Sequence, residues 1–207
     1  MKEAKEALKV RILDGAIALF LEKGIANVTT RELTESLGIS RSHIYHYFSN
    51  WQALCTAALE RFMRDELEIF TREVAALPST QKMDRLVADF LPFEQDAAWQ
   101  LYGATWQLAL HNDVYAELVE SIMQAWSELV RDIIEEGVED SIFDALIIEE
   151  GVENGIFRAC DASRTTRQLI SLLSGYDEFL GVRPSAEKCA MVQADIADFI
   201  QRFIYKA

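Results

Sequence analysis

Apolar residues recur at spacings of three and four along almost all of the 207-residue chain, and this is the pattern of amphipathic helices. Only three prolines and nine glycines interrupt it. We therefore predict an all-α protein. The expected helices span roughly residues 5–23, 29–37, 40–48, 51–76, 81–91, 99–110, a segment from about 113 onward, 164–180 and 186–205.

Start and stop signals frame the short helices near the N-terminus. Thr29 and Glu32 form a capping box, in which each side chain satisfies an unpaired backbone amide at the start of the helix. Gly38 is suited to a tight turn, and Ser40 is a good N-cap for the helix that follows. A second capping box at residues 49–52 is expected to open the long fourth helix.

Two short helices joined by a glycine turn are typical of a helix-turn-helix. We predict that residues 1–50 form a three-helix DNA-binding domain and that residues 51–76 form a linking helix. Residues 77–207 are expected to form a larger helical domain for ligand binding and dimerisation.

The second of these short helices is polar where a recognition helix meets the major groove, which presents acceptors on guanine and donor and acceptor groups on adenine. Arg41 is the candidate for base reading, with His43 and His46 beside it. Hydroxyls of Thr30 and of nearby tyrosines are candidates for phosphate contacts. The predicted DNA-contacting residues are Thr30, Arg31, Ser40, Arg41, Ser42, His43, Tyr45, His46 and Tyr47.

Spacing alone leaves a second interpretation open, in which these are two short helices of an ordinary bundle with an aromatic cluster. His43 and His46 could also be considered metal ligands. Their i, i+3 spacing without nearby carboxylates or cysteines is weak support for a metal site.

Charge is distributed unevenly along the chain, whose formal net charge is −14. Residues 1–64 carry nine basic and seven acidic residues, a balance of +2, and the remainder carries eleven basic and 27 acidic residues, a balance of −16. Only the first segment tolerates a phosphate backbone, and the acidic remainder is repelled from DNA.

Other function classes have little support in the sequence. No GxSxG, HExxH, Walker or Rossmann fingerprint occurs, so we predict neither an enzyme nor a cofactor. The three cysteines Cys55, Cys160 and Cys189 are far apart, which suggests buried free thiols. No apolar run is long enough to cross a membrane and the N-terminus has no apolar signal core, so we expect a cytoplasmic protein without membrane contact.

The ordered motifs between residues 8 and 65 closely resemble the N-terminal domain of the tetracycline-repressor (TetR) family. The resemblance is carried by Ala16-Ile17-Ala18-Leu19-Phe20, Gly24, Val28-Thr29-Thr30-Arg31-Glu32-Leu33, Leu37-Gly38-Ile39-Ser40, Ile44-Tyr45-His46-Tyr47-Phe48 and Ala53-Leu54. It implies a three-helix DNA-binding domain, a connecting fourth helix, and a homodimer whose last two helices, here about 164–180 and 186–205, form a four-helix bundle with a second subunit.

Two positions depart from that family's usual pattern. Trp51 stands where most members open the fourth helix with a lysine, so a phosphate contact is in doubt. Ser42 and His43 stand where Gly and Thr are common, so an operator sequence cannot be transferred.

Aromatic residues are frequent in the expected sensing domain, whose stretch from Trp99 to Gly137 resembles the branch that includes the repressor of glycine-betaine synthesis. Such residues at helical spacing are typical of core packing. With Glu94, Asp96 or Glu178 nearby they could instead hold an organic cation, and an apolar or acidic ligand is a further alternative. The candidate ligand-binding residues are Phe90, Trp99, Tyr102, Trp106, Met123, Trp126 and Tyr176.

Residues 133–143 recur almost unchanged at 147–157, an offset of fourteen residues or about four helical turns. Such a duplication keeps the apolar face on one side. We expect a long or kinked helix ending near Asn154, and a break at Ser141 is the alternative.

Taken together, these patterns predict a ligand-responsive transcriptional repressor. It binds a palindromic double-stranded operator as a homodimer and is released by a small molecule that the sequence does not identify. The alternative is a helical protein–protein adaptor with a vestigial helix-turn-helix domain.

Overall fold

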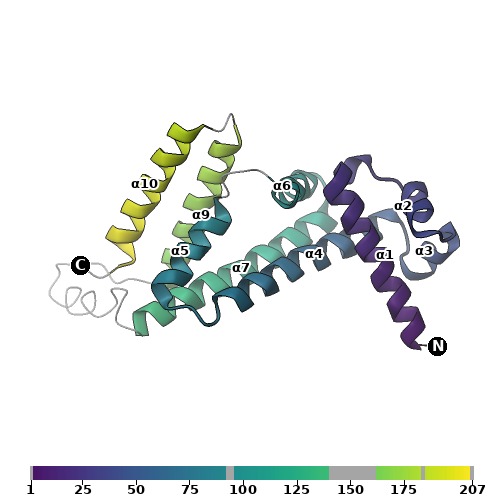
Figure 1. The fold of residues 1–207 in the computed structure, drawn as a ribbon, viewed down its shortest axis with the longest axis horizontal. Coiled ribbons are helices and arrows are strands. Elements are labelled where there is room, and N and C mark those ends of the chain that lie inside the picture. Colours follow the sequence, from purple (N-terminus) through teal and green to yellow (C-terminus); the bar gives the residue numbers. More distant parts are fainter. Residues whose placement is uncertain (1, 92–95, 140–161, 183–184, 206–207) are drawn as a thin grey trace. The chain divides into compact units, whose positions relative to one another are not determined.

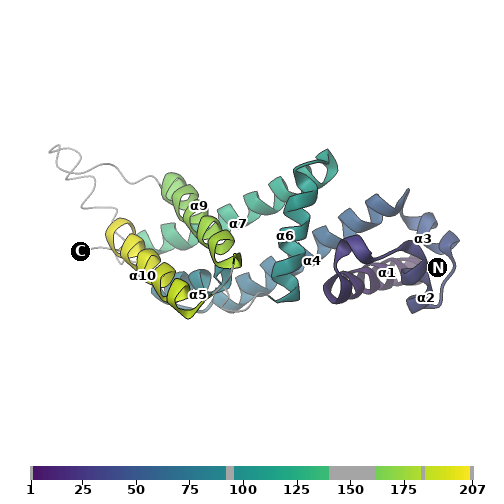
Figure 2. The ribbon, with the colours of Figure 1, turned by 90° about the horizontal axis from the view of Figure 1, so that it is seen from above.

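The computed structural model describes residues 2–91, 96–139, 162–182 and 185–205 (Figures 1 and 2). No β-strand occurs in these ranges, which confirms the predicted all-α class. The helices are α1 (Lys2–Lys23), α2 (Thr30–Leu37), α3 (Arg41–Tyr47), α4 (Trp51–Val74), α5 (Ser79–Phe90), α6 (Ala97–Ala109), α7 (Asp113–Glu139), α9 (Ala162–Gly181) and α10 (Ala186–Phe203), with a 3₁₀ turn η1 at Ile25–Asn27.

The chain divides into two compact units, and the division falls within α4 and within α7. The first unit comprises residues 1–69 and 95–123, and the second comprises 70–94 and 124–207. The predicted border at residue 76, between linking helix and sensing domain, stays a prediction.

In the first unit, α1 packs against α2 and α2 against α3, as Figure 1 shows. Ile12, Phe20, Leu33 and Ile44 are fully or almost fully buried between these helices. At Gly15 a Cβ atom would lie 2.9 Å from the side chain of Leu37, so the absence of a side chain permits this close approach of α1 and α2. The predicted three-helix arrangement is therefore present.

The helix starts agree with the capping predictions only in part. Thr29 is the N-cap of α2, and its hydroxyl accepts a hydrogen bond from the Glu32 amide. The Glu32 carboxylate accepts from the Thr29 backbone amide, as the capping box requires, and it also pairs with Lys23 at the end of α1. At α4 the predicted box at 49–52 is wrong by one residue, because the Asn50 side chain accepts from the Ala53 amide at 2.8 Å.

The second unit is built around one apolar cluster from α5, α7, α9, α10 and the end of α4. Met83, Leu86, Leu169, Leu173 and Val192 have no exposed surface. At its edge Lys82, with only 9% of its side chain exposed, donates to both carboxylate oxygens of Glu136. This ion pair joins α5 to α7, because a buried ammonium group requires a counter-charge.

The predictions for the internal repeat lie mostly outside the described residues. Its first part, Ile133 to Glu139, belongs to α7, and Ile133 and Ile134 are buried in the second unit. Residues 140–161, which include Ser141, Asn154 and Cys160, are not described.

The remaining cysteines occupy different environments. Cys55 is buried, and this burial raises the pKa of its thiol to about 12, so the reactive thiolate is scarce near neutral pH. Cys189 is half-buried. Among the described helices, none is both long and apolar enough to cross a membrane, and the described side chains contain no group of three or more potential metal ligands.

We expect alanine to have opposite effects at two glycines. Gly38 has φ 64° and ψ 34°, so Gly38→Ala would place a side chain in the left-handed region and reduce the free energy of unfolding by about 1 kcal/mol. Gly103 lies inside α6 with no atom within 4 Å of an added Cβ, so Gly103→Ala should increase that free energy by about 0.5–1 kcal/mol. Urea unfolding followed by circular dichroism measures both, and shifts in the same direction would contradict the role given to Gly38.

Candidate nucleic-acid interface

Helix α3 exposes nearly all of its side chains. Gly38 closes α2 in the left-handed conformation, and the chain enters α3 three residues later. Ile44 is the one fully buried residue of α3 and faces the domain core. Five of the seven side chains of α3 are exposed, namely Arg41, Ser42, His43, Tyr45 and His46.

The structure gathers all nine predicted DNA-contacting residues on α2, α3 and the turn between them. Arg31 and Ser40 are exposed like the five residues of α3, whereas Thr30 and Tyr47 are half-buried. The placement agrees with a DNA-contacting role, and the role of each residue stays a prediction.

Arg41, Tyr45 and Thr30 form one polar cluster. The Arg41 guanidinium carbon lies 6.0 Å from the centre of the Tyr45 ring, whose side chain is 40% exposed. Hydrogen bonds from Thr30 and then from Arg41 lower the pKa of the Tyr45 phenol. The cluster joins the first residue of α2 to one side of α3, so hydroxyl donors and a cation lie together.

A second network corrects the prediction that the Ser40 side chain caps α3. Ser40 occupies the N-cap position, but its hydroxyl makes no capping hydrogen bond. It lies 2.7 Å from the Ser42 hydroxyl and 2.7 Å from His43 Nδ1. Ser40 therefore holds the His43 ring through Nδ1 and leaves Nε2 as the ring nitrogen available to a ligand.

Arg31 is paired within its own helix. Its Nε donates to Glu35 Oε1 at 2.8 Å, and its side chain is 84% exposed. The hydrogen bond to Glu35 raises the pKa of Arg31. A phosphate that contacts Arg31 must therefore compete with a carboxylate of the protein itself.

Trp51 has a structural contact in place of the phosphate contact that a lysine would make. Its ring meets the buried Phe20 ring edge-on, with 6.4 Å between ring centres.

Two arginines of the domain make contacts within the protein. Arg11 donates to the Leu37 carbonyl at the end of α2, and Arg61 of α4 pairs with Asp14 of α1 at 3.0 Å. These basic residues connect α1 to α2 and α4 to α1, a role that spacing along the chain did not indicate.

The candidate ligand-binding residues lie in both units. In the first unit Tyr102 packs between Phe62 and Trp106, with 5.8 Å between ring centres in each pair, and Trp99 and Met123 belong to the same unit. In the second unit Trp126 packs between Phe70 and Phe90, and the Tyr176 hydroxyl donates to Asp195 at 2.8 Å. Ligand binding by these residues stays a prediction, and Glu94 lies outside the described residues.

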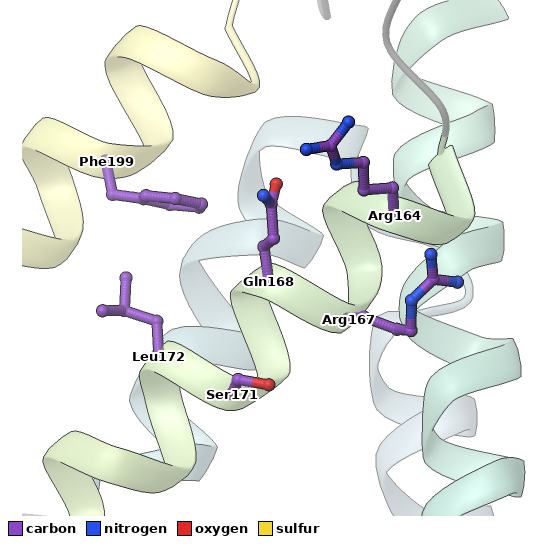
Figure 3. Close-up of a pocket in the computed structure, with 6 residues that line it drawn as sticks. All are labelled: Arg164, Arg167, Gln168, Ser171, Leu172 and Phe199. Carbon is purple, nitrogen blue, oxygen red and sulfur yellow. The ribbon is translucent and has the colours of Figure 1, made fainter.

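A groove of about 570 Å³ runs along α9 in the second unit (Figure 3). None of the seven candidate ligand-binding residues lines it. Its lining residues are Arg164, Arg167, Gln168, Ser171, Leu172 and Phe199.

Comparison with known proteins identifies the N-terminal domain. Residues 12–58 match the model of the bacterial regulatory proteins of the tetR family, and this range runs from within α1 through α2 and α3 into α4. Residues 12–58 are thus similar to the DNA-binding domain of TetR-family regulators. The chain is a DNA-binding transcriptional regulator with a helix-turn-helix.

Named relatives of the chain are transcriptional regulators as well. The HTH-type transcriptional repressor KstR2 of Rhodococcus jostii (strain RHA1) is 25% identical over 142 residues, which are 67% of this chain and 69% of KstR2. The regulator YttP of Bacillus subtilis (strain 168) is 21% identical over 136 residues, which are 64% of this chain and 66% of YttP. Each match thus spans about two thirds of the relative's length.

Among solved structures, a transcriptional regulator from Saccharomonospora viridis in complex with choline matches with a TM-score of 0.74. The match covers 100% of both chains at 20% identity. At this identity it shows that the two proteins share a fold.

Neutralising Glu35 tests whether Arg31 faces the DNA. We expect Glu35→Gln to strengthen binding to non-specific duplex DNA about fivefold at low salt, because it removes a carboxylate worth about 1 kcal/mol at contact distance in water. Fluorescence anisotropy at several salt concentrations measures this effect. Glu120→Gln, at an exposed position on α7, makes the same charge change and is the control. An equal gain in both variants would show that only net charge matters.

Proposed function

We propose that the protein is an effector-responsive repressor that binds a palindromic operator as a homodimer. The observation that supports this most directly is α3, a seven-residue helix with one buried residue and five exposed polar or aromatic side chains. A helix with this distribution serves recognition, since it contributes little to the core.

Arg41 is our candidate for reading a base. It contacts the Tyr45 ring and donates to the Tyr45 hydroxyl, which restrains the side chain, and its other guanidinium donors can reach the guanine O6 and N7 acceptors. Thr30 and Tyr45 are our candidates for donating hydroxyl hydrogens to phosphates, and Thr30 would exchange its hydrogen bond to Tyr45 for one to a phosphate. The backbone amides at the start of α2 add further donors.

Exposed apolar side chains on the last two helices support the homodimer. Phe179 and Val182 are exposed at the end of α9, and Met191 and Phe203 are exposed on α10. Large exposed apolar residues on two neighbouring helices are typical of a subunit interface. Two reader domains related by a two-fold axis require an operator with two-fold symmetry.

Effector response is proposed to run through α6. This helix carries Trp99, Tyr102 and Trp106, and within the first unit it packs against α1 of the DNA-binding domain. A ligand that binds one position of α6 better than another shifts α1 with it, and operator affinity changes by that difference in binding free energy.

An organic cation is the effector class that we propose. Aromatic ring faces and carboxylates are the groups that hold quaternary ammonium ions, and the strongly acidic remainder of the chain favours a cation. The Saccharomonospora viridis regulator of the same fold was crystallised with choline.

Selection of bound sequences from a random duplex pool tests operator recognition. We expect wild-type protein to enrich a palindrome with half-sites about one helical turn or more apart. Arg41→Ala should lose about 1–3 kcal/mol of discrimination at one base of each half-site, whereas Arg72→Ala on α4 should retain the same palindrome. If nothing is enriched even at low salt, the operator-binding proposal is wrong and the adaptor interpretation is preferred.

Choline titration tests the effector. We expect a saturable change in tryptophan fluorescence that Trp106→Leu weakens at least tenfold and that Trp51→Leu, in the DNA-binding domain, leaves intact. Choline should weaken operator binding by the same factor by which operator weakens choline binding, because the coupling is reciprocal. The absence of a saturable change would exclude a choline-like effector without affecting the operator proposal.

A further inference from the structure

Two serine hydroxyls and one imidazole lie in a row at the start of α3. His43 Nδ1 lies 2.7 Å from the Ser40 hydroxyl, and that hydroxyl lies 2.7 Å from the Ser42 hydroxyl. The side chain of Ser40 makes no capping hydrogen bond to α3, so its hydroxyl is available to the ring. The three side chains therefore form a short chain of hydrogen bonds that ends on the imidazole.

The contact at Nδ1 decides which nitrogen of the His43 ring faces outward. Nδ1 and Nε2 lie on opposite sides of the ring carbon Cε1, so a ring that turns Nδ1 toward Ser40 directs Nε2 away from it. The His43 side chain is exposed, so Nε2 can reach a molecule bound at this end of α3. Whether Nε2 donates or accepts depends on the form of the neutral ring.

The hydroxyl pair can stabilise either neutral form of the ring. With hydrogen on Nε2, Ser42 donates to Ser40 and Ser40 donates to Nδ1 of His43. With hydrogen on Nδ1, both hydrogen bonds run the other way and Nε2 is an acceptor. The surface of DNA is strongly negative, and N7 of guanine and of adenine is an acceptor in the major groove. Bound DNA therefore favours the form with hydrogen on Nε2.

His43 and Arg41 project from different sides of α3. They are two residues apart, which is about 200° around a helix. Arg41 contacts Tyr45, one turn farther along, whereas His43 is held back toward Ser40 at the N-terminal end. The N-terminal residues of a recognition helix contact base edges. We therefore expect the two side chains to reach different base pairs, so that their contributions can be measured separately.

We propose that His43 is a specificity-determining residue that donates from Nε2 to N7 of a purine, with Ser40 and Ser42 as positioning residues that hold the ring in this form. The inference rests on the proposed operator binding and adds one base contact to it. Guanine and adenine both carry N7 and the pyrimidines do not, so this donor selects a purine. A contact to a phosphate would make no such distinction.

Operators that carry 7-deazapurines test the contact, because this change replaces N7 by a carbon and keeps the base pair. The operator is the palindrome that wild-type full-length protein enriches from the random duplex pool. When the purines of one half-site are replaced singly, one replacement away from the base assigned to Arg41 should weaken wild-type binding about fivefold, as expected for one neutral hydrogen bond. His43→Ala should bind the natural and the replaced operator equally, and should keep the sensitivity at the base assigned to Arg41.

Substitutions of Ser40 separate positioning from stability. Ser40→Ala removes the hydroxyl beside Nδ1, so the fivefold effect should fall to about twofold or less, while the discrimination due to Arg41 is kept. Ser40→Thr retains a hydroxyl and should retain both effects. Ser36→Ala is the matched control, because this serine lies on α2 and donates to the Leu33 carbonyl. It should change neither effect, and thermal unfolding checks that every variant is folded.

The other outcomes each overturn a stated part. If no replacement distinguishes wild type from His43→Ala, or if His43→Ala loses affinity equally for all sequences, His43 does not read a purine. A preference for the amino group of cytosine or adenine that depends on His43 would show that Nε2 accepts, and the assigned form of the ring would be wrong. If Ser40→Ala weakens discrimination at every base equally, Ser40 supports only the fold. If wild type enriches no sequence, the proposed operator binding itself fails.

Discussion

Burial of Ile44 determines which side chains of α3 face outward. A seven-residue helix is too short to be stable in isolation, so its position depends on tertiary contacts. Ile44 and Leu33 are completely buried, and the left-handed Gly38 turn sets the direction in which the chain leaves α2. With the buried side fixed in this way, the polar side chains of α3 can only point away from the core.

Several cations of the N-terminal segment are already paired with carboxylates of the protein, so the charge balance overstates how many of them can contact DNA. Lys23 pairs with Glu32, Arg31 with Glu35 and Arg61 with Asp14. Several cations of the nearly balanced N-terminal segment thus serve α1, α2 and α4 themselves. Arg41 contacts the ring and the hydroxyl of Tyr45 instead, a side chain that is not a carboxylate.

The division into two units decides which helices each amphipathic helix contacts. Helix α6 belongs to the same compact unit as α1 and packs against it. Helix α9 belongs to the other unit, where Leu169 and Leu173 are buried in the core. The proposed coupling of effector to operator was therefore assigned to α6, the helix that contacts α1.

The sequence by itself determined the helical class, the helix boundaries to within a few residues, the glycine turn after α2 and the polar character of α3. Periodicity, capping residues and positive-φ glycines act over a few neighbouring positions, so they can be read along the chain. Tertiary structure decided the rest. Glu32 pairs with Lys23 in addition to its own helix start, Arg61 pairs with Asp14, and Trp51 packs against Phe20. Each of these partners lies nine or more residues away along the chain, and only the fold brought it within reach.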